Sequence, residues 1–182
     1  MDTLISFMIQ DMKNVCIYLP QALAAGAVYV LVYVLFRRFG RHCNHGFQHL
    51  FLRTLFVIYA VMLVMIVFFS RETGSRQGVD LTFLGTWGIT ARAHSFVIEN
   101  ILLFIPFGIL FPVWLPKGKR GYTVPAGCLC SIFIEYLQLR TGRGFCQLDD
   151  VVMNSLGTLV GFILMESGCF LFLNMKKHLW SK

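Results

Sequence analysis

Residues 54–70 read TLFVIYAVMLVMIVFFS and contain no charged side chain. The core of a bilayer requires about 20 predominantly apolar residues in a helix that crosses it, so this stretch predicts a membrane-spanning helix. Four further stretches have a similar length and composition: 17–36, 96–115, 121–139 and 150–173. The sequence therefore predicts an all-α fold, a polytopic transmembrane bundle of about five helices.

The composition agrees with this prediction. Hydrophobic residues make up 57% of the chain and charged residues only 14%, whereas soluble domains are about 25% charged. This balance excludes a soluble globular domain and a disordered chain. The net charge is +7, but the basic residues lie mostly in short connections between apolar runs, which is typical of membrane topology. We therefore expect membrane lipids as partners, and no nucleic acid.

The chain is predicted to form one membrane domain with three parts. Residues 1–70 hold two transmembrane helices, residues 71–95 form an extracytoplasmic loop, and residues 96–182 form a three-helix core. Five crossings place the two termini on opposite sides of the membrane. The connections on the side of the C-terminus carry ten basic residues against six on the other side. The positive-inside rule then predicts a multi-pass protein of the bacterial cell membrane with its N-terminus outside and its C-terminus in the cytoplasm.

Polar side chains within the last three spans are predicted to gather at one end of the bundle. Because consecutive spans run in opposite directions, the start of the third span, the end of the fourth and the start of the fifth lie at the same side. The polar residues at these three places are Glu99, Asn100, Glu135, Gln138, Asp149, Asp150 and Asn154. An ionised carboxylate in hydrocarbon is costly unless it meets water, a partner or a cation. We therefore expect a shared, outward-facing polar pocket.

The spacing within the helices supports this arrangement. Glu135 and Gln138 are three residues apart and share a helix face. In the fifth span, Asp150, Asn154, Gly157 and Gly161 form one stripe, in which the two glycines permit close approach of another helix. Glu166 lies deeper on the opposite face, and the sequence assigns it no role. In the third span, Pro106 removes the usual donor to the Leu102 carbonyl and is expected to bend the helix.

Candidate roles follow from these residue types. Glu135 and Asp150 are the candidates for acid–base chemistry, although the residues leave open whether any reaction takes place. The expected binding residues, which supply carboxylates, amides and guanidinium groups, are Asn100, Gln138, Arg143, Asp149, Asn154, Glu99 and Arg76. Arg143 is the expected anion binder because guanidinium forms bidentate contacts with phosphate or carboxylate.

Other interpretations remain open for the same residues. The buried polar side chains could serve only to hold helices together, and Asp149 could cap the start of the fifth span. No cofactor is expected. A divalent cation at Asp149 and Asp150 is not favoured, because adjacent helix residues diverge by about 100°. The histidines and cysteine between residues 42 and 49 are interpreted as an interfacial loop rather than a metal site.

The order of these motifs resembles the VanZ family of bacterial membrane proteins. The similarity is carried by NILLFIPFG at 100–108, Glu135-x-x-Gln138, Arg143, and DDVVMNSLGTLVG at 149–161, and it covers about residues 76–165. The first two spans match only as generic apolar helices. The connection between Arg143 and Asp149 departs from the family pattern with Phe145 and Cys146.

This resemblance implies a role in the cell envelope. The founding member of the family confers low-level resistance to teicoplanin. Our first hypothesis is binding or modification of an anionic lipid or a lipid-linked cell-wall precursor at the outer leaflet, with an effect on glycopeptide susceptibility. The alternative is a non-enzymatic adaptor or structural protein whose polar residues assemble helices with a membrane protein partner.

Overall fold

The computed structural model describes the backbone of residues 2–39, 46–69, 74, 78–85 and 90–180. Its helices are α1 (Asp2–Cys16), α2 (Leu19–Arg38), α3 (Phe47–Val64), α4 (Ala91–Leu110), α5 (Thr123–Thr141) and α6 (Leu148–Trp180). Short helical turns are η1 (Met65–Phe69), η2 (Phe111–Trp114) and η3 (Lys117–Tyr122), and the strands are β1 (Val79–Asp80) and β2 (Cys146–Gln147). The all-α bundle that the sequence predicts is confirmed.

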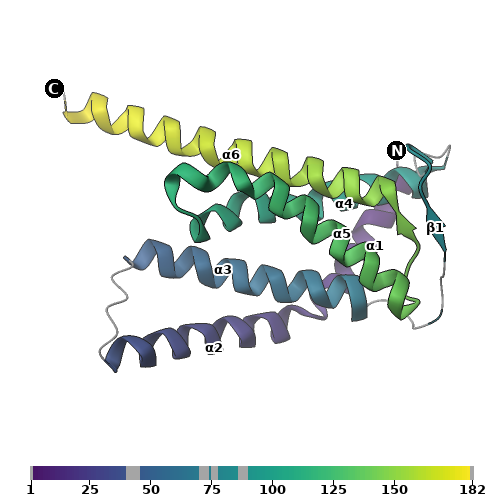
Figure 1. Cartoon of the computed structure of the whole chain (residues 1–182), viewed down its shortest axis with the longest axis horizontal. Helices are drawn as coiled ribbons and strands as arrows, with labels where there is room; N and C mark the ends of the chain where they lie inside the picture. Colours follow the sequence, from purple (N-terminus) through teal and green to yellow (C-terminus); the bar gives the residue numbers. More distant parts are fainter. Residues whose placement is uncertain (1, 40–45, 70–73, 75–77, 86–89, 181–182) are drawn as a thin grey trace.

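Four helical segments are long and apolar enough to cross a membrane. They cover residues 19–38, 47–69, 91–114 and 148–169. The remaining predicted span corresponds to α5, which lies between α3 and α6 in Figure 1. It is less apolar because Ser131, Glu135 and Gln138 lie along it, and the protein buries all three. The polar character of α5 is therefore turned inward, away from the lipid.

Helix α1 is an element that the hydropathy pattern does not predict. It runs across the end of the bundle near the N-terminus, at a steep angle to α2 (Figure 1). An ion pair of 2.9 Å between Asp11 and Arg92 ties it to the start of α4. The Arg92 guanidinium also lies 5.0 Å from the centre of the Phe7 ring. Helix α1 has 15 residues, fewer than a membrane-spanning helix requires, and its contacts with α4 hold it beside the bundle.

Helices α4 and α6 run side by side in the same direction and touch through their backbones. A Cβ atom added at Gly157 would overlap the Ile101 carbonyl oxygen, and one at Gly161 would overlap that of Ile105. On the opposing helix, a Cβ atom at Gly108 would overlap the carbonyl oxygen of Thr158. The predicted glycine stripe is thus confirmed. Such close approach is how helices gain dispersion energy in lipid, where the hydrophobic effect does not drive them together.

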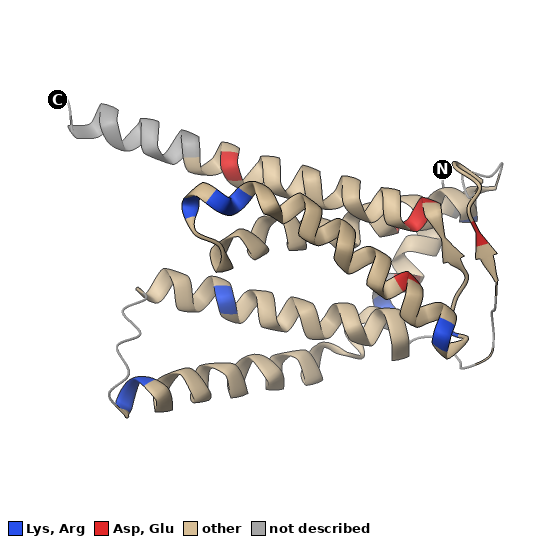
Figure 2. Cartoon of the chain, viewed as in Figure 1, with Lys and Arg blue, Asp and Glu red and all other residues tan. Residues whose placement is uncertain are grey.

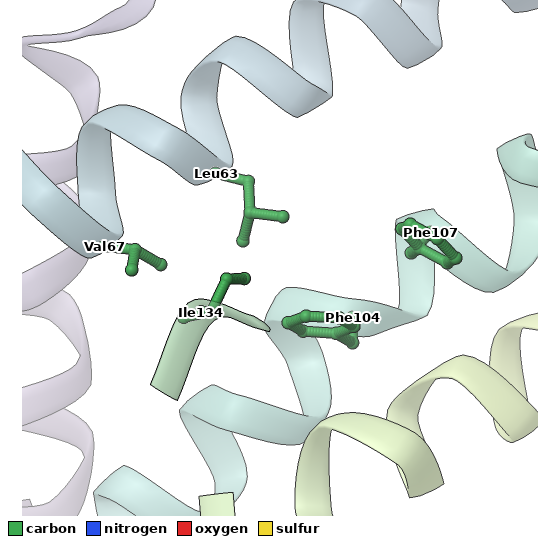
Figure 3. Close-up of a cluster of buried hydrophobic side chains, with 5 residues drawn as sticks. All are labelled: Leu63, Val67, Phe104, Phe107 and Ile134. Atoms are coloured by element: carbon green, nitrogen blue, oxygen red, sulfur yellow. The ribbon is translucent and has the colours of Figure 1, made fainter. Parts of the chain in front are cut away.

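The apolar core joins α3, α4 and α5. Figure 3 shows the buried cluster of Leu63, Val67, Phe104, Phe107 and Ile134. Helix α4 continues through Pro106 to Leu110, and the hydroxyl of Tyr59 on α3 donates to the Leu103 carbonyl at 2.9 Å, one residue from the carbonyl that the proline leaves without a donor. These contacts hold the start of η1 and the middle of α4 against α5.

Candidate functional site

The predicted polar residues lie at one end of the bundle, where α6 begins, α5 ends and the strands pair. Figure 2 shows acidic residues on α5, α6 and β1 at this end, with a basic residue close to the end of α5. Four of the side chains, Glu135, Gln138, Asp149 and Asn154, are each only 3% exposed. We call these four residues, with Asn100, Ser131, Arg143 and Asp150, the polar cluster.

The first turn of α6 directs its two carboxylates to different neighbours. Asp150 Oδ1 accepts a hydrogen bond of 2.6 Å from the Asn100 side-chain amide on α4. Asp149 Oδ1 accepts one of 2.6 Å from the backbone N–H of Leu84, in the segment that precedes α4. The divergence of about 100° between adjacent helix residues accounts for this separation. Asp150 therefore links α4 to α6, whereas Asp149 holds the segment before α4.

Leu84 has a backbone conformation that is unusual for its residue type. Its φ angle is +59°, in the left-handed region that non-glycine residues rarely occupy. The hydrogen bond to Asp149 helps to hold it there. Backbone conformations of this kind persist only where surrounding contacts enforce them, and they cluster at functional sites.

Helix α5 contributes a buried polar face. Ser131, Glu135 and Gln138 follow one another at intervals of four and three residues. Ser131 Oγ accepts a hydrogen bond of 2.8 Å from the Asn154 amide on α6, and Glu135 Oε2 accepts one of 3.0 Å from the backbone N–H of Gln147. In the described part of the chain, the side-chain oxygens of Gln138 and Asn154 are buried without a hydrogen-bond partner. These two acceptors are suited to a donor from a ligand or a water molecule.

The segments before α4 and after α5 cover the polar cluster rather than leaving it open. Val79 pairs with Cys146 and Asp80 with Gln147 in a short parallel ladder, and the Gly74 N–H donates to the Gly142 carbonyl at 2.9 Å. The sequence predicts an open pocket at this place. In the structure the polar groups lie together, but these segments bury them. The backbone N–H groups of Gln147 and Leu84 donate hydrogen bonds to the Glu135 and Asp149 carboxylates. In an open pocket, water molecules would donate these bonds.

Arg143 connects this end of the bundle to α3. It follows Gly142, which ends α5 with φ of +64°, and its guanidinium donates to the Phe68 carbonyl at 2.6 Å. The same group lies 5.5 Å from the centre of the Phe69 ring. A cation at the last carbonyls of a helix is favoured by the helix dipole. Arg143 therefore positions the end of η1, a contact that the sequence does not reveal.

Glu99 belongs to a different set of contacts from its neighbour Asn100. Glu99 interacts electrostatically with Asp11 and Arg92. The structure thus groups it with α1, a helix that the sequence analysis does not predict. Arg76, the remaining predicted binding residue, lies outside the described residues, as do residues 42–45 of the histidine-rich connection.

Cys146 is a further member of this region that sequence reasoning did not assign to the site. Partial burial and the negative charges of Glu135 and Asp150 raise the pKa of its thiol. Both carboxylates therefore act on one sulfur atom, which places Glu135 and Asp150 in a common neighbourhood. Among the described residues, no group of three or more histidine, cysteine, aspartate or glutamate side chains is arranged to hold a metal ion.

The other end of the bundle is basic. Figure 2 shows lysine and arginine residues on α2, α3 and η3 at the end away from the polar cluster. The Glu166 carboxylate, to which the sequence analysis assigns no role, lies 3.6 Å from the Arg120 guanidinium of η3. The two ends of the bundle therefore differ in charge as well as in burial of polar groups.

These features define a multi-pass helical membrane protein with a buried polar cluster at one end. The sequence profile of the VanZ/LLP1 family matches residues 56–172, and the chain belongs to this family. The match starts within α3, earlier than residue 76, where the motif resemblance begins. No curated protein and no solved structure matches the chain.

Proposed function

We propose that this chain is a cell-envelope protein that binds the polar part of an anionic lipid or of a lipid-linked cell-wall precursor at the polar cluster. The observation that carries the proposal is the burial, at one end of three helices, of carboxylate and amide groups with two acceptors left unpaired. Burying so many polar groups costs free energy, and packing alone has less costly solutions. The Gln138 and Asn154 oxygens would accept hydrogen bonds from ligand hydroxyl or amide groups.

The roles within the proposal follow the contacts. Arg143 supplies the positive charge of the cluster for a phosphate or carboxylate, while its bond to Phe68 fixes its position. Glu135 and Asp150 orient the ligand or move protons, since carboxylates accept hydrogen bonds and exchange protons. Strain at Leu84, next to Asp149, supports a functional rather than a purely structural cluster.

We place the polar cluster at the outer leaflet, with the N-terminus outside and the C-terminus in the cytoplasm. The support is the basic character of the opposite end, which the positive-inside rule assigns to the cytoplasm. Single-cysteine variants test this orientation in intact cells. A membrane-impermeant maleimide should label Phe83→Cys, which lies in the exposed outer loop, and should not label Gly118→Cys of η3. The reverse labelling would overturn the orientation.

The function is tested by removing charge without changing shape. Glu135→Gln and Asp150→Asn should abolish any gain in teicoplanin tolerance that the wild-type chain gives a susceptible host, with an unchanged amount of folded protein on fluorescence-detected gel filtration. Glu166→Gln is the matched control, because it makes the same chemical change at the basic end. Variants of the polar cluster that fold normally and retain full tolerance would contradict the proposal.

A second candidate function is favoured by two specific contacts. The bonds between Asn100 and Asp150 and between Asn154 and Ser131 each join two helices, as expected if the polar groups serve assembly, including assembly with a membrane protein partner. This alternative predicts that the same variants lose folded protein in proportion to activity. A mass spectrum of the gently purified protein separates the two: a bound lipid precursor supports the first, and a stoichiometric protein supports the second.

A further inference from the structure

An apolar groove of about 430 Å³ runs along α3 on a face that includes no residue of the polar cluster. Its lining residues are Phe56, Val57, Ala60, Val61, Val64, Met65 and Trp114. The α3 and η1 residues among them recur at intervals of one and three, so they form a single helix face. The nine steps from Phe56 to Met65, at a rise of 1.5 Å each, extend about 14 Å, which is the scale of a lipid acyl segment.

A cation lies at one end of this groove. Arg53 precedes Val57 by one helical turn, and its guanidinium lies 4.8 Å from the centre of the Trp114 ring. Trp114 in turn packs edge-to-face on Phe56, with ring centres 6.0 Å apart. Within the described residues, the buried Nε of Arg53 has no hydrogen-bond partner. Arg53, stacked on Trp114 at the end of the groove, can therefore offer its remaining N–H donors to an anion.

The surroundings favour an anionic occupant. Arg53 contacts Trp114 at the end of η2, three residues before η3, which carries Lys117 and Lys119. Figure 2 shows basic residues on α2, α3 and η3 at this end of the bundle. Glu166, the acidic residue described at this end, is already close to Arg120. A tryptophan with basic neighbours is typical of the level at which lipid headgroups lie. The positive charge of Arg53 and the apolar lining of the groove therefore both favour a molecule with an anionic head and an apolar chain.

We propose that the groove along α3 binds one acyl chain of an anionic phospholipid whose phosphate is held by Arg53. The Arg53 end of this lipid site lies opposite to the polar cluster, and the site does not depend on the proposed function. A lipid in this place packs against both α3 and η2 and so stabilises their contact.

Brominated lipids test the proposal, because bromine quenches nearby tryptophan fluorescence. The full chain, with Trp87→Phe and Trp180→Phe so that emission comes from Trp114, is placed in phosphatidylcholine nanodiscs. Brominated phosphatidylglycerol is compared with brominated phosphatidylcholine of the same chain length. A single basic contact near the membrane surface predicts about fivefold preferential quenching by phosphatidylglycerol.

Two variants and one control decide the outcome. Arg53→Gln should bring the preference to about onefold, and Ala60→Phe, which fills the groove, should reduce quenching by both lipids. Arg120→Gln removes a cation at the same end that already faces Glu166, and it should leave the preference unchanged. Equal quenching by the two lipids in the parent, or a preference that survives Arg53→Gln, would overturn the proposal. Protection of Trp114 by a second copy, seen as a dimer together with loss of quenching, would overturn it as well.

Discussion

The contact between α4 and α6 and the contact between α2 and α3 use glycine in different ways. At Gly157 and Gly161, an added Cβ would overlap backbone carbonyl oxygens, which cannot move without moving a helix. At Gly26 of α2, it would approach the Ile58 side chain at 2.6 Å, and a side chain can change rotamer. The contact between α4 and α6 therefore permits one arrangement of the two helices, whereas the contact between α2 and α3 permits several.

This difference shows which part of the bundle is specified in detail. Helices α4 and α6 are also joined by the bond between Asn100 and Asp150, so a rigid pair of helices carries the polar cluster. Most of α2 faces outward, with Leu23, Val28 and Leu31 more than half exposed. The family match, over residues 56–172, excludes α1 and α2 and includes the rigid pair.

The largest effect is expected from Gly157→Ala. The new methyl group must push α4 from α6, so we expect a loss of about 3 kcal/mol in the free energy of unfolding, measured by denaturant titration in detergent micelles. Gly168→Ala is the matched control in the same helix, because nothing lies within 4 Å of its Cβ position. The control should be neutral or more stable by up to about 1 kcal/mol, from helix propensity. Equal stability of the two variants would refute the close contact.

A smaller loss is expected from Asn100→Ala. Removing a donor from a partly buried carboxylate costs about 1.5 kcal/mol, measured in the same titration. Thr54→Val is the control on α3, because the Thr54 hydroxyl bonds only back to the Leu50 carbonyl of its own helix. A loss for Thr54→Val as large as that for Asn100→Ala would remove the distinction between the two helix pairs.

Gly26→Ala should cost less than about 1 kcal/mol, because the Ile58 side chain can move aside and the alanine gains helix propensity. Combining it with Ile58→Ala should leave a coupling energy close to the whole penalty of Gly26→Ala in a double-mutant cycle. Independence of the two changes would show that α2 and α3 are separated in the membrane.

The reactivity of Cys146 should change with charge while stability changes least. Because burial and the charges of Glu135 and Asp150 raise the pKa of this thiol, less thiolate is present at a given pH. Asp150→Asn removes one negative charge, lowers the pKa and should increase the alkylation rate at pH 8, whereas Glu166→Gln should not. The rate should rise with pH until it passes the thiol pKa. An unchanged rate in Asp150→Asn would argue against the shared neighbourhood.

Several site contacts follow from local spacing, and others do not. The stripe from Asp150 to Gly161 is predictable because helical periodicity alone places those residues on one face. Ser131 lies four residues before Glu135, a spacing that signals its place on the same face, although a serine in an apolar span attracts little notice. The bonds from Leu84 to Asp149 and from Arg143 to Phe68 join segments 65 and 75 residues apart, and no local pattern encodes them.

Hydropathy, helical period and the order of polar motifs determined the all-α membrane fold, the end of the bundle at which polar groups meet, and the family. These properties depend on the solvent that each residue prefers and on a fixed helix geometry. Only the tertiary structure decided that α1 lies against α4, that Glu99 faces Asp11 and Arg92, and that loops cover the polar cluster. Those outcomes depend on which surfaces meet after the helices assemble, because a polar group has many candidate partners in sequence and takes those that packing brings within reach.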